Sequence, residues 1–348
     1  MDARERLLAA LTWQEPDRVP LTVYDNLFLR GRAERLLRES GVGLIMRRTA
    51  HRVEHRQVEF TSREYWEDGQ KRIRRTIHTP VGEVWQTLEA EGGYDSSNWI
   101  LEHFIKQPED YPVMEFTIRD ALYHDNYESI REAQRRLGGD GLVYINLGKA
   151  PIQEMLYKMM GMERFALDFH FQRDLFDSLH SAMLERYEQL YDLAAESSVE
   201  VIVLTDNITG DVVGHQRFQD YCAPIYRGLK KRLSGSGKLV GVHMDGRLQS
   251  LVKEIAEAEF DIVEAFTPPP LGDVSVREAR EMWPGKTLWL NFTSCMHVET
   301  SRAIEAHTRQ LLEEAGSRRG FAIGVTEDAP IEALELSLGT ISRVLSES

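Results

Sequence analysis

The carboxyl-terminal half of the sequence alternates between short apolar runs and longer amphipathic stretches. The clearest apolar run is Val199–Thr205, a β-branched series that is typical of a strand buried on both faces. Four further strands are predicted at residues 238–243, 261–266, 287–292 and 321–324. Between and after them, apolar residues recur at helical spacing, which predicts helices at residues 216–233, 246–258, 274–282, 299–315 and from Ile331 onward. Strands that alternate with helices through short loops predict an α/β fold with a parallel sheet.

The amino-terminal half supplies the remaining strands. Apolar runs at residues 19–24, 42–46 and 142–146 raise the number of predicted strands to eight, which is the number that closes a (β/α)8 TIM barrel. An open, doubly wound sheet is the alternative, but no Gly-x-Gly-x-x-Gly turn follows any of these runs. We therefore expect one barrel domain over residues 1–348, with its active site at the carboxyl ends of the strands.

One stretch interrupts this rhythm. Residues 51–90 are polar, rich in Thr, Arg and Glu, and alternate in the manner of antiparallel strands, with a turn signal at Thr79-Pro80-Val81-Gly82. We expect β-hairpins here, outside the barrel and over or beside its mouth. Residues 173–196 carry their apolar side chains on one stripe, which predicts a long helix packed on a core.

The composition narrows the class of protein. Of 348 residues, 42% are hydrophobic and 28% are charged, as in an ordinary globular protein. The formal net charge of −14 argues against nucleic acid or an anionic membrane as the main partner, because both require a basic face. No apolar run reaches the roughly 20 residues that span a bilayer, and the first residues predict an amphipathic helix rather than a signal peptide. The two cysteines, Cys222 and Cys295, fit a reduced, cytoplasmic chain better than a disulfide-bonded one.

Polar side chains follow almost every predicted strand. In a barrel these positions converge at one end, where the chemistry takes place. Asn and Asp also follow strands as turn formers and helix caps, but Glu264 and His243 are poor at both, so the ring as a whole favours a site. Its members are Asp25, Asn26, Asn146, Asp206, Asn207, His243, Asp245, Glu264, Asn291, Cys295 and Glu327. As contacts to a small-molecule substrate we expect Asp25, Asn26, Asn146, Asn207, Glu264 and Asn291.

His243 and Asp245 form the sharpest pair in this ring. Residues i and i+2 of an extended strand end point the same way, so an imidazole and a carboxylate converge there. A zinc site with an open position needs about three protein ligands and accepts nitrogen and oxygen donors. Glu327, Asp206, Glu264 or Cys295 is the candidate third ligand. The alternatives are a histidine that is merely hydrogen-bonded to its neighbour and a Cys295 thiol that is inert.

Several short segments resemble one enzyme family in their order and spacing over most of the chain. They are RLLAAL and EPDRVP (residues 6–11 and 15–20), TPVG (79–82), IKQPEDY (105–111), TDN (205–207), APIY (223–226), VHMDG (242–246), FTPPPLGD (266–273) and IGVTEDAP (323–330). The chain thereby resembles the uroporphyrinogen decarboxylase superfamily, which also contains corrinoid-linked coenzyme M methyltransferases and related O-demethylase methyltransferases. The resemblance implies the barrel fold and a homodimer, for which aromatic residues between Trp99 and Tyr127 are candidate contacts.

The sequence departs from this family where the branches differ in activity. The decarboxylases carry Arg-Gln-x-Gly-Arg-Tyr after the first strand to hold substrate carboxylates, whereas here only Arg30 and Arg32 are loose equivalents, and the family's catalytic aspartate segment has no counterpart. The methyltransferases bind zinc through a His-x-Cys pair and a later cysteine. His243 matches that histidine, Asp245 replaces the first cysteine and Glu327 stands near the second. Carboxylate ligands would suit an oxygen-bound methyl group better than a thiol.

Three functions follow as alternatives. The resemblance favours a metal-dependent methyltransferase that moves a methyl group between a small O-methyl donor and a corrinoid held by a separate protein, with zinc or another divalent metal on His243, Asp245 and Glu327. The second alternative is a decarboxylase, a lyase without a cofactor, that uses Asp206, His243 or Glu327 as acid and base. The third is a barrel that binds a corrinoid or another tetrapyrrole without catalysis.

Overall fold

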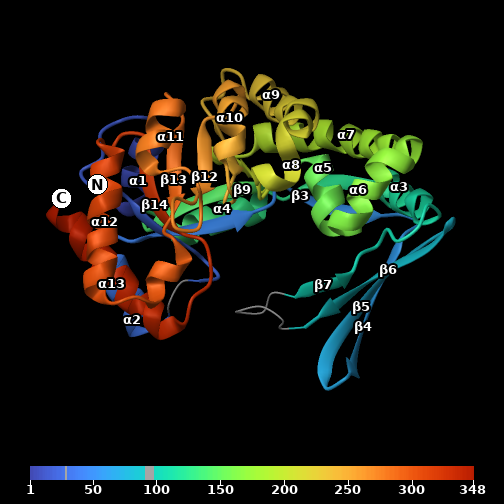
Figure 1. Cartoon of the computed structure of the whole chain (residues 1–348), viewed down its shortest axis with the longest axis horizontal. Coiled ribbons are helices and arrows are strands. Elements are labelled where there is room, and N and C mark those ends of the chain that lie inside the picture. Colours follow the sequence, from blue (N-terminus) through green and yellow to red (C-terminus); the bar gives the residue numbers. More distant parts are fainter. Residues whose placement is uncertain (28–29, 91–97) are drawn as a thin grey trace. The chain divides into compact units, whose positions relative to one another are not determined.

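Eight parallel strands close into a barrel in the computed structural model, which describes residues 1–27, 30–90 and 98–348. Figure 1 shows the barrel strands with helices packed around them. The strands are β1 Leu21–Tyr24, β2 Gly43–Arg48, β9 Gly141–Gly148, β10 Val201–Leu204, β11 Leu239–His243, β12 Ile262–Phe266, β13 Thr287–Asn291 and β14 Phe321–Val325. Around the barrel they follow the order β1-β14-β13-β12-β11-β10-β9-β2, and β1 pairs with both β14 and β2. The predicted (β/α)8 barrel is confirmed, with every strand close to its expected position.

Contacts between elements divide the chain into two compact units, and the first contains the barrel. This unit comprises residues 1–50, 127–148 and 197–348. Its helices are α1 Ala3–Leu11, α2 Arg32–Glu39, α4 Tyr127–Leu137, α8 Gly210–Arg217, α9 Ala223–Arg232, α10 Val252–Glu257, α11 Val276–Met282, α12 Ser301–Ala315 and α13 Ile331–Glu347. Single helical turns lie at η3 Phe218–Cys222, η4 Gln249–Leu251 and η5 Ser294–Val298. That residues 1–348 form one domain stays a prediction.

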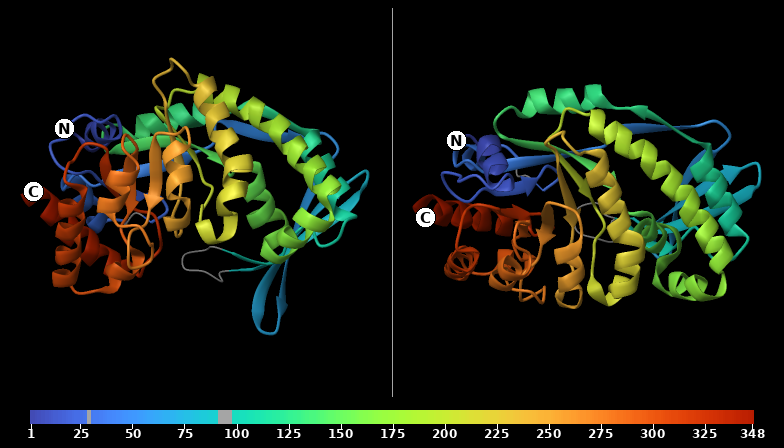
Figure 2. Two further views of the ribbon diagram at one scale, coloured as in Figure 1. Left: turned by 45° about the horizontal axis from the view of Figure 1, so that its top comes forward. Right: turned by 90° about the horizontal axis from the view of Figure 1, so that it is seen from above.

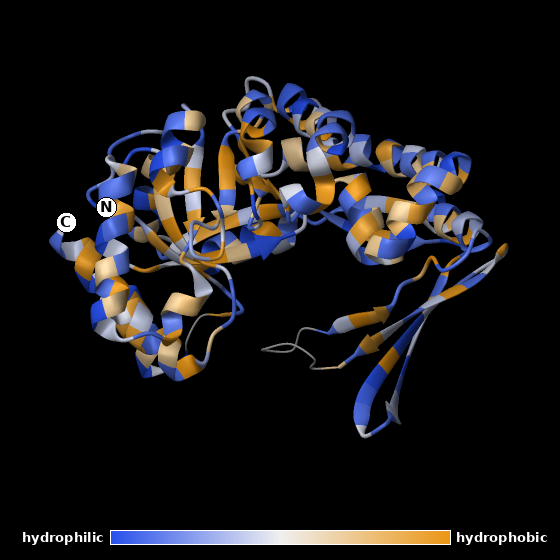
Figure 3. Cartoon of the chain, in the orientation of Figure 1, coloured by the Kyte–Doolittle hydropathy of each residue, from blue (hydrophilic) through white to orange (hydrophobic). Residues whose placement is uncertain are grey.

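The barrel strands are buried on both faces, which explains their continuous apolar runs. Every residue of β12, β13 and β14 is buried, and Figure 3 shows the apolar colours along these strands. The helices outside are amphipathic by contrast. For example, α12 begins where the Thr300 side chain accepts a hydrogen bond from the Ala303 amide, and it ends at Gly316, whose φ of 65° suits glycine. Helices α12 and α13 pack side by side at the carboxyl-terminal end of the chain (Figure 2).

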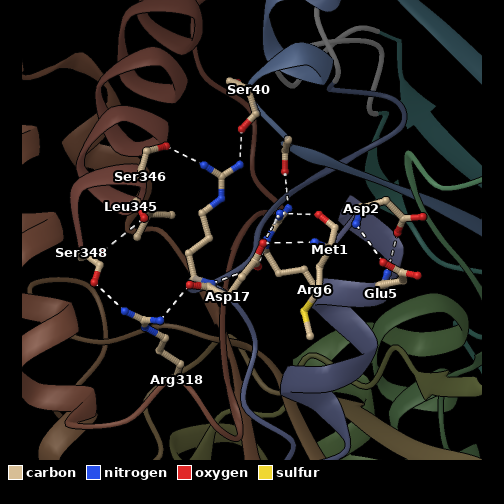
Figure 4. Close-up of polar contacts among 12 residues, drawn as sticks. Met1, Asp2, Glu5, Arg6, Asp17, Ser40, Arg318, Leu345, Ser346 and Ser348 are labelled. Carbon is tan, nitrogen blue, oxygen red and sulfur yellow. Dashed lines mark hydrogen bonds and ion pairs between the residues drawn. The ribbon is translucent and has the colours of Figure 1, made fainter.

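A polar network ties the two ends of the chain to the start of β1 (Figure 4). Arg6 of α1 forms a bidentate pair with Asp17, in which Nε donates to Oδ1 at 2.6 Å and Nη2 donates to Oδ2 at 2.9 Å. Arg318 donates to the backbone oxygens of Asp17 and Ser348, at 2.7 and 2.5 Å. The hydrogen bonds from Arg6 hold the pKa of the Asp17 carboxyl well below its usual range. These contacts fix α1 and α13 beside the seam where β1 meets β14.

The second unit comprises residues 51–126 and 149–196. Its larger sheet is antiparallel in the order β4 Glu59–Glu67, β5 Gln70–Thr79, β6 Gly82–Glu89 and β7 Trp99–Glu102. A second sheet pairs β3 His51–His55 with β8 Ala121–Asp125. The helices are α3 Asp110–Asp120, α5 Pro151–Glu154, α6 Gly161–Phe171 and α7 Arg173–Glu196, with a π-helical turn η2 Met155–Met160. Helix α7 spans the predicted residues and buries the predicted apolar stripe.

The predicted hairpins are confirmed for residues 59–89. Strands β5 and β6 are joined at the predicted turn, where Thr79 pairs with Gly82. The prediction is wrong for residues 51–55, because His51 pairs with Asp125 rather than with the neighbouring segment. Local alternation identifies a strand, but it does not identify a partner so distant in the sequence. Whether the hairpins lie beside the barrel mouth stays a prediction. Among the described residues, no helix is long and apolar enough to cross a membrane.

Candidate active site

The strand register places a row of side chains on the inner face of the barrel, at its carboxyl end. Directly paired residues of neighbouring parallel strands point the same way. His243 pairs with Glu264, and Glu264 pairs with Trp289, so these three side chains share a face. The hydroxyl of Tyr24 donates to Glu264 Oε1 at 2.5 Å, although β1 and β12 are not neighbours in the sheet. A contact between two strands that do not adjoin identifies this face as the interior.

A backbone irregularity positions Glu264. The register between β12 and β13 shifts between Glu264 and Phe266, and Ala265 between them has a φ of 55°. This β-bulge holds a non-glycine residue in the left-handed region, which costs about 1–3 kcal/mol. The Glu264 carbonyl also accepts a hydrogen bond from the Met244 amide at 2.9 Å. The bulge and this bond together fix the end of β12 against the end of β11.

His243 lies between two carboxylates. Its Nδ1 is 2.6 Å from Glu264 Oε2, and its Nε2 is 3.4 Å from Asp245 Oδ2. Glu264 is fully buried, whereas the His243 side chain keeps 12% of its surface exposed. Burial lowers the pKa of His243, but the charge of Glu264 and the hydrogen bonds of both carboxylates outweigh it and raise the pKa from 6.5 to about 10. At neutral pH this side chain is therefore an imidazolium with both N–H groups directed at carboxylate oxygens.

Two buried tyrosines complete the surroundings of Glu264. Tyr24 donates to its carboxylate, and the Tyr144 hydroxyl donates to the Tyr24 hydroxyl at 3.3 Å. Burial raises the pKa of both hydroxyls well above the ordinary value, so both keep their protons. Trp289, beside Glu264 on the same row, donates from Nε1 to Thr22 Oγ1 at 3.0 Å. The sequence reasoning missed both tyrosines because an aromatic residue in an apolar strand has the signature of core packing.

The loops after β10 and β11 hold each other and orient Asp245. The Ile208 amide donates to the His243 carbonyl and the Gly246 amide to the Ile208 carbonyl, both at 3.2 Å. A Cβ atom at Gly246 would lie 2.3 Å from the Thr209 Cβ, so this close approach requires glycine. Asn207 donates from Nδ2 to Asp245 Oδ2 at 3.4 Å. Asp245 thus faces His243, as the i and i+2 spacing predicts.

Two predicted asparagines brace the ends of their strands. Asn146 Oδ1 accepts hydrogen bonds from the Gly148 amide at 2.9 Å and from Thr205 Oγ1 at 3.1 Å. Asn291 is fully buried, and its Oδ1 accepts from the Thr326 amide at 3.2 Å. Such bonds stabilise the loops that carry the site. Contact of either side chain with a substrate stays a prediction.

Asp25 and Asn26 lie after β1 and face two arginines at the end of β2. Asp25 Oδ2 is 3.5 Å from Arg48 Nη1. Asn26 Oδ1 accepts from Arg47 Nη2 at 2.6 Å, and the Arg47 guanidinium lies over the Tyr24 ring, 4.1 Å from its centre. The sequence reasoning did not include the arginines, because a pair of basic residues at a strand end usually belongs to a solvated surface.

Three further predicted residues are Asp206, Glu327 and Cys295. Asp206 is fully buried and accepts a hydrogen bond from the Tyr226 hydroxyl of α9 at 2.6 Å. Glu327 is half-buried beyond β14, with no ion pair to a described residue. Cys295 is exposed on η5. Their catalytic and metal-binding roles stay predictions.

Comparison with known proteins assigns the family. The family model of uroporphyrinogen decarboxylase (URO-D) matches residues 100–341, which is more than half of the chain. The chain belongs to the URO-D family. Its fold is similar to that of a methyltransferase from Methanosarcina mazei, with a TM-score of 0.57 and 13% identity over 99% of each chain. A muconate cycloisomerase from Pseudomonas fluorescens is matched over 84% of this chain and 77% of its own, at 11% identity. Its TM-score of 0.23 is too low to indicate a shared fold. None of the curated protein sequences matches the chain.

Two of the three predicted zinc ligands, His243 and Asp245, lie together in this URO-D family enzyme, and the zinc site itself stays a prediction. Across residues 1–27, 30–90 and 98–348, no group of three or more His, Cys, Asp or Glu side chains is gathered so as to hold a metal ion. His243 and Asp245 supply two donors, and Glu264 binds Nδ1 of His243. A zinc site needs about three protein ligands, of which His243 and Asp245 would supply two.

Proposed function

We propose that this URO-D family enzyme transfers a methyl group from the oxygen of a small O-methyl donor to a corrinoid carried by a separate protein. The observation that carries the proposal is the His243 imidazolium between Glu264 and Asp245 at the carboxyl end of the barrel. The fold shared with the Methanosarcina mazei methyltransferase supports methyl transfer. The corrinoid acceptor rests on the resemblance in sequence described above.

The chemistry of the donor explains why an acid is needed. When the bond between methyl carbon and oxygen breaks, its electron pair stays on oxygen and produces an alkoxide or phenolate. The acceptor supplies the electron pair for the new bond to carbon. A proton from His243 Nε2 converts the departing oxygen to a hydroxyl, so the product is an alcohol or a phenol. The 3.4 Å contact of Nε2 with Asp245 is long, so a substrate oxygen can replace it as the acceptor.

The neighbours of His243 suit it to this step. Glu264 binds Nδ1 and thereby fixes the ring and its charge, while Tyr24 holds Glu264 in turn. Burial lowers the pKa of His243, but the charge of Glu264 and the hydrogen bonds of the carboxylates raise it above its ordinary value, so the ring carries a proton to give at neutral pH.

A carboxy-lyase is the second candidate, because the matching family model describes a uroporphyrinogen decarboxylase. The same imidazolium can protonate carbon after loss of carbon dioxide. A substrate with eight carboxylates requires several cations, however, and Arg30 and Arg32 after β1 are exposed to solvent. We therefore expect purified enzyme to form no coproporphyrinogen from uroporphyrinogen.

The test of methyl transfer uses His243→Gln, which keeps a polar side chain but has no proton to give. Purified enzyme is incubated with reduced cobalamin as acceptor and with anisole, 2-methoxyphenol, 4-methoxybenzoate or methoxyacetate, and demethylated product is measured by liquid chromatography. We expect product from the wild type and a rate about 10²–10⁴-fold lower in the variant. His78→Gln, on the exposed face of β5, serves as the control and should match the wild type. The proposal fails if no donor is demethylated, or if His243→Gln retains the wild-type rate.

A further inference from the structure

Arg47 points into the barrel beside the row that carries His243. Arg47 of β2 pairs directly with Tyr144 of β9, so the two side chains lie on the same face of the sheet. That face is the interior, since the Tyr144 hydroxyl reaches the Tyr24 hydroxyl within the barrel. Arg48, the next residue, points the other way and faces Asp25. A cation is thus built into the inner face at the same end as the imidazolium.

The Arg47 guanidinium has few partners for a half-buried charge. One N–H group donates to Asn26 Oδ1 at 2.6 Å, and the plane lies 4.1 Å from the centre of the Tyr24 ring. Among the residues that the structure describes, no carboxylate lies within 4.0 Å of it. A guanidinium presents five N–H donors in a planar fork that matches a carboxylate. Burying such a group without an anion is unfavourable unless a ligand supplies one.

The surroundings place a bound anion at a useful distance from the chemistry. Arg47 stacks on the Tyr24 ring, the Tyr24 hydroxyl binds Glu264, and Glu264 binds His243. Tyr24 and Glu264 therefore form a hydrogen-bonded pair with Arg47 on one side and His243 on the other. A ligand whose anion is held by Arg47 can direct its other end toward His243 Nε2.

We propose that Arg47 binds the carboxylate of the substrate, which is accordingly an O-methylated carboxylic acid. A carboxylate is favoured over a phosphate because a second negative charge would be repelled by Asp245, Glu264 and Asp25 at the same end of the barrel. The presence of a methyl ether in the ligand rests on the proposed function. The assignment of Arg47 as a carboxylate site does not depend on that function.

Calorimetric titration tests the carboxylate site separately from the proposed methyl transfer. Benzoate, which has no methyl group to transfer, is titrated into wild-type enzyme, Arg47→Met, Arg47→Lys and Arg48→Met, with 4-methoxybenzoate and 4-methoxybenzamide as further probes. We expect the Kd of both carboxylates to rise at least 10-fold in Arg47→Met and less in Arg47→Lys, which keeps the charge and loses the fork. Arg48→Met, the matched control on the same strand, should raise the Kd less than Arg47→Met does, because Arg48 faces Asp25 rather than the barrel interior. The uncharged amide should bind weakly and equally to all four proteins.

The outcomes decide the inference without the methyl-transfer assay. It is overturned if neither carboxylate binds the wild type, if Arg47→Met binds no more weakly than Arg48→Met, or if the amide binds as tightly as the acid. Tighter binding of phenylphosphonate than of benzoate would overturn the inference, because the ligand of Arg47 would then be a phosphate rather than a carboxylate. If benzoate binding depends on Arg47 but 4-methoxybenzoate is not demethylated, the carboxylate site stands and the proposed function fails. Demethylation of neutral donors, with no dependence on Arg47, would leave the function standing and overturn the inference. Unfolding temperatures measured by circular dichroism confirm that each variant is folded.

Discussion

The substitution Glu264→Gln should destabilise the protein and remove most of the pH dependence that His243 contributes to stability. Glu264 is fully buried and accepts hydrogen bonds from Tyr24 and His243. Glutamine has nearly the same shape but no charge, so the variant tests the ion pair rather than the packing. Removing one partner of a buried ion pair typically costs about 3–5 kcal/mol.

The magnitude also follows from the pKa of His243. This pKa is about 10 in the folded protein and 6.5 without the protein environment. Because the folded value is raised, the stabilisation is complete below pH 6.5 and is lost as the pH rises toward 10. The folded pKa lies about 3 pH units above pH 7, and at roughly 1.36 kcal/mol per unit this leaves a stabilisation of ~4 kcal/mol at pH 7. Asp245 keeps part of the effect, so we expect Glu264→Gln to lower the free energy of unfolding by ~3 kcal/mol at pH 7.

The assay is urea unfolding followed by circular dichroism at pH 6, 7, 8 and 9. The difference between wild type and variant cancels other titrating groups, such as Lys286, whose pKa burial lowers to about 8. That difference should shrink steadily as the pH rises. Glu254→Gln is the matched control, since Glu254 is also nearly buried and binds His215, a histidine that is largely exposed. The reasoning is refuted if Glu264→Gln loses no more stability than Glu254→Gln, or if its deficit is the same at pH 6 and pH 9.

Three further predictions test other parts of the account. Dialysis against EDTA should leave demethylation unchanged, because no group of three or more candidate ligands is gathered among the described residues. Activity that is lost to EDTA and restored by zinc would instead indicate that His243, Asp245 and Glu327 bind the metal. Burial lowers the pKa of His297 to about 4, so this group stabilises the fold above pH 6.5 and loses that contribution as the pH falls toward 4. In urea unfolding, wild type should therefore lose ~3 kcal/mol more than His297→Asn between pH 6.5 and 4, and equal losses would contradict the burial argument. Light scattering at micromolar concentration should give a dimer, as the resemblance in sequence implies, and a monomer throughout would reject it.

The barrel was predictable because its strands are buried on both faces. Runs such as Val199–Thr205 and Thr287–Phe292 have the same signature wherever they occur in the barrel, and the observed strands β10 and β13 fall within them. The β3–β8 pairing was not predictable, since nothing local to residues 51–55 indicates a partner at 121–125. Only long-range contacts choose that partner.

The site was predictable only in part. Strand geometry alone brings His243 and Asp245 together, because residues two apart point the same way. That Glu264 would bind the other nitrogen of His243 depends on the register between β11 and β12 and on the bulge at Ala265, neither of which the sequence reveals. Arg47 and Tyr24 were missed for the same reason, since their role depends on which strands close the barrel.

The most direct test of the central claim, that His243 gives its proton to the departing oxygen, compares two donors that differ in how much they need that proton. 4-Methoxybenzoate and 4-methoxy-3-nitrobenzoate share the carboxylate and the methyl ether, but the nitro group makes the departing phenolate a much weaker base. Single-turnover rates of demethylation are measured for wild type and His243→Gln with each donor. We predict a loss of about 10²–10⁴-fold with 4-methoxybenzoate and at most about 10-fold with the nitro compound. Equal losses with the two donors would show that His243 positions the substrate without donating a proton, and would contradict the account.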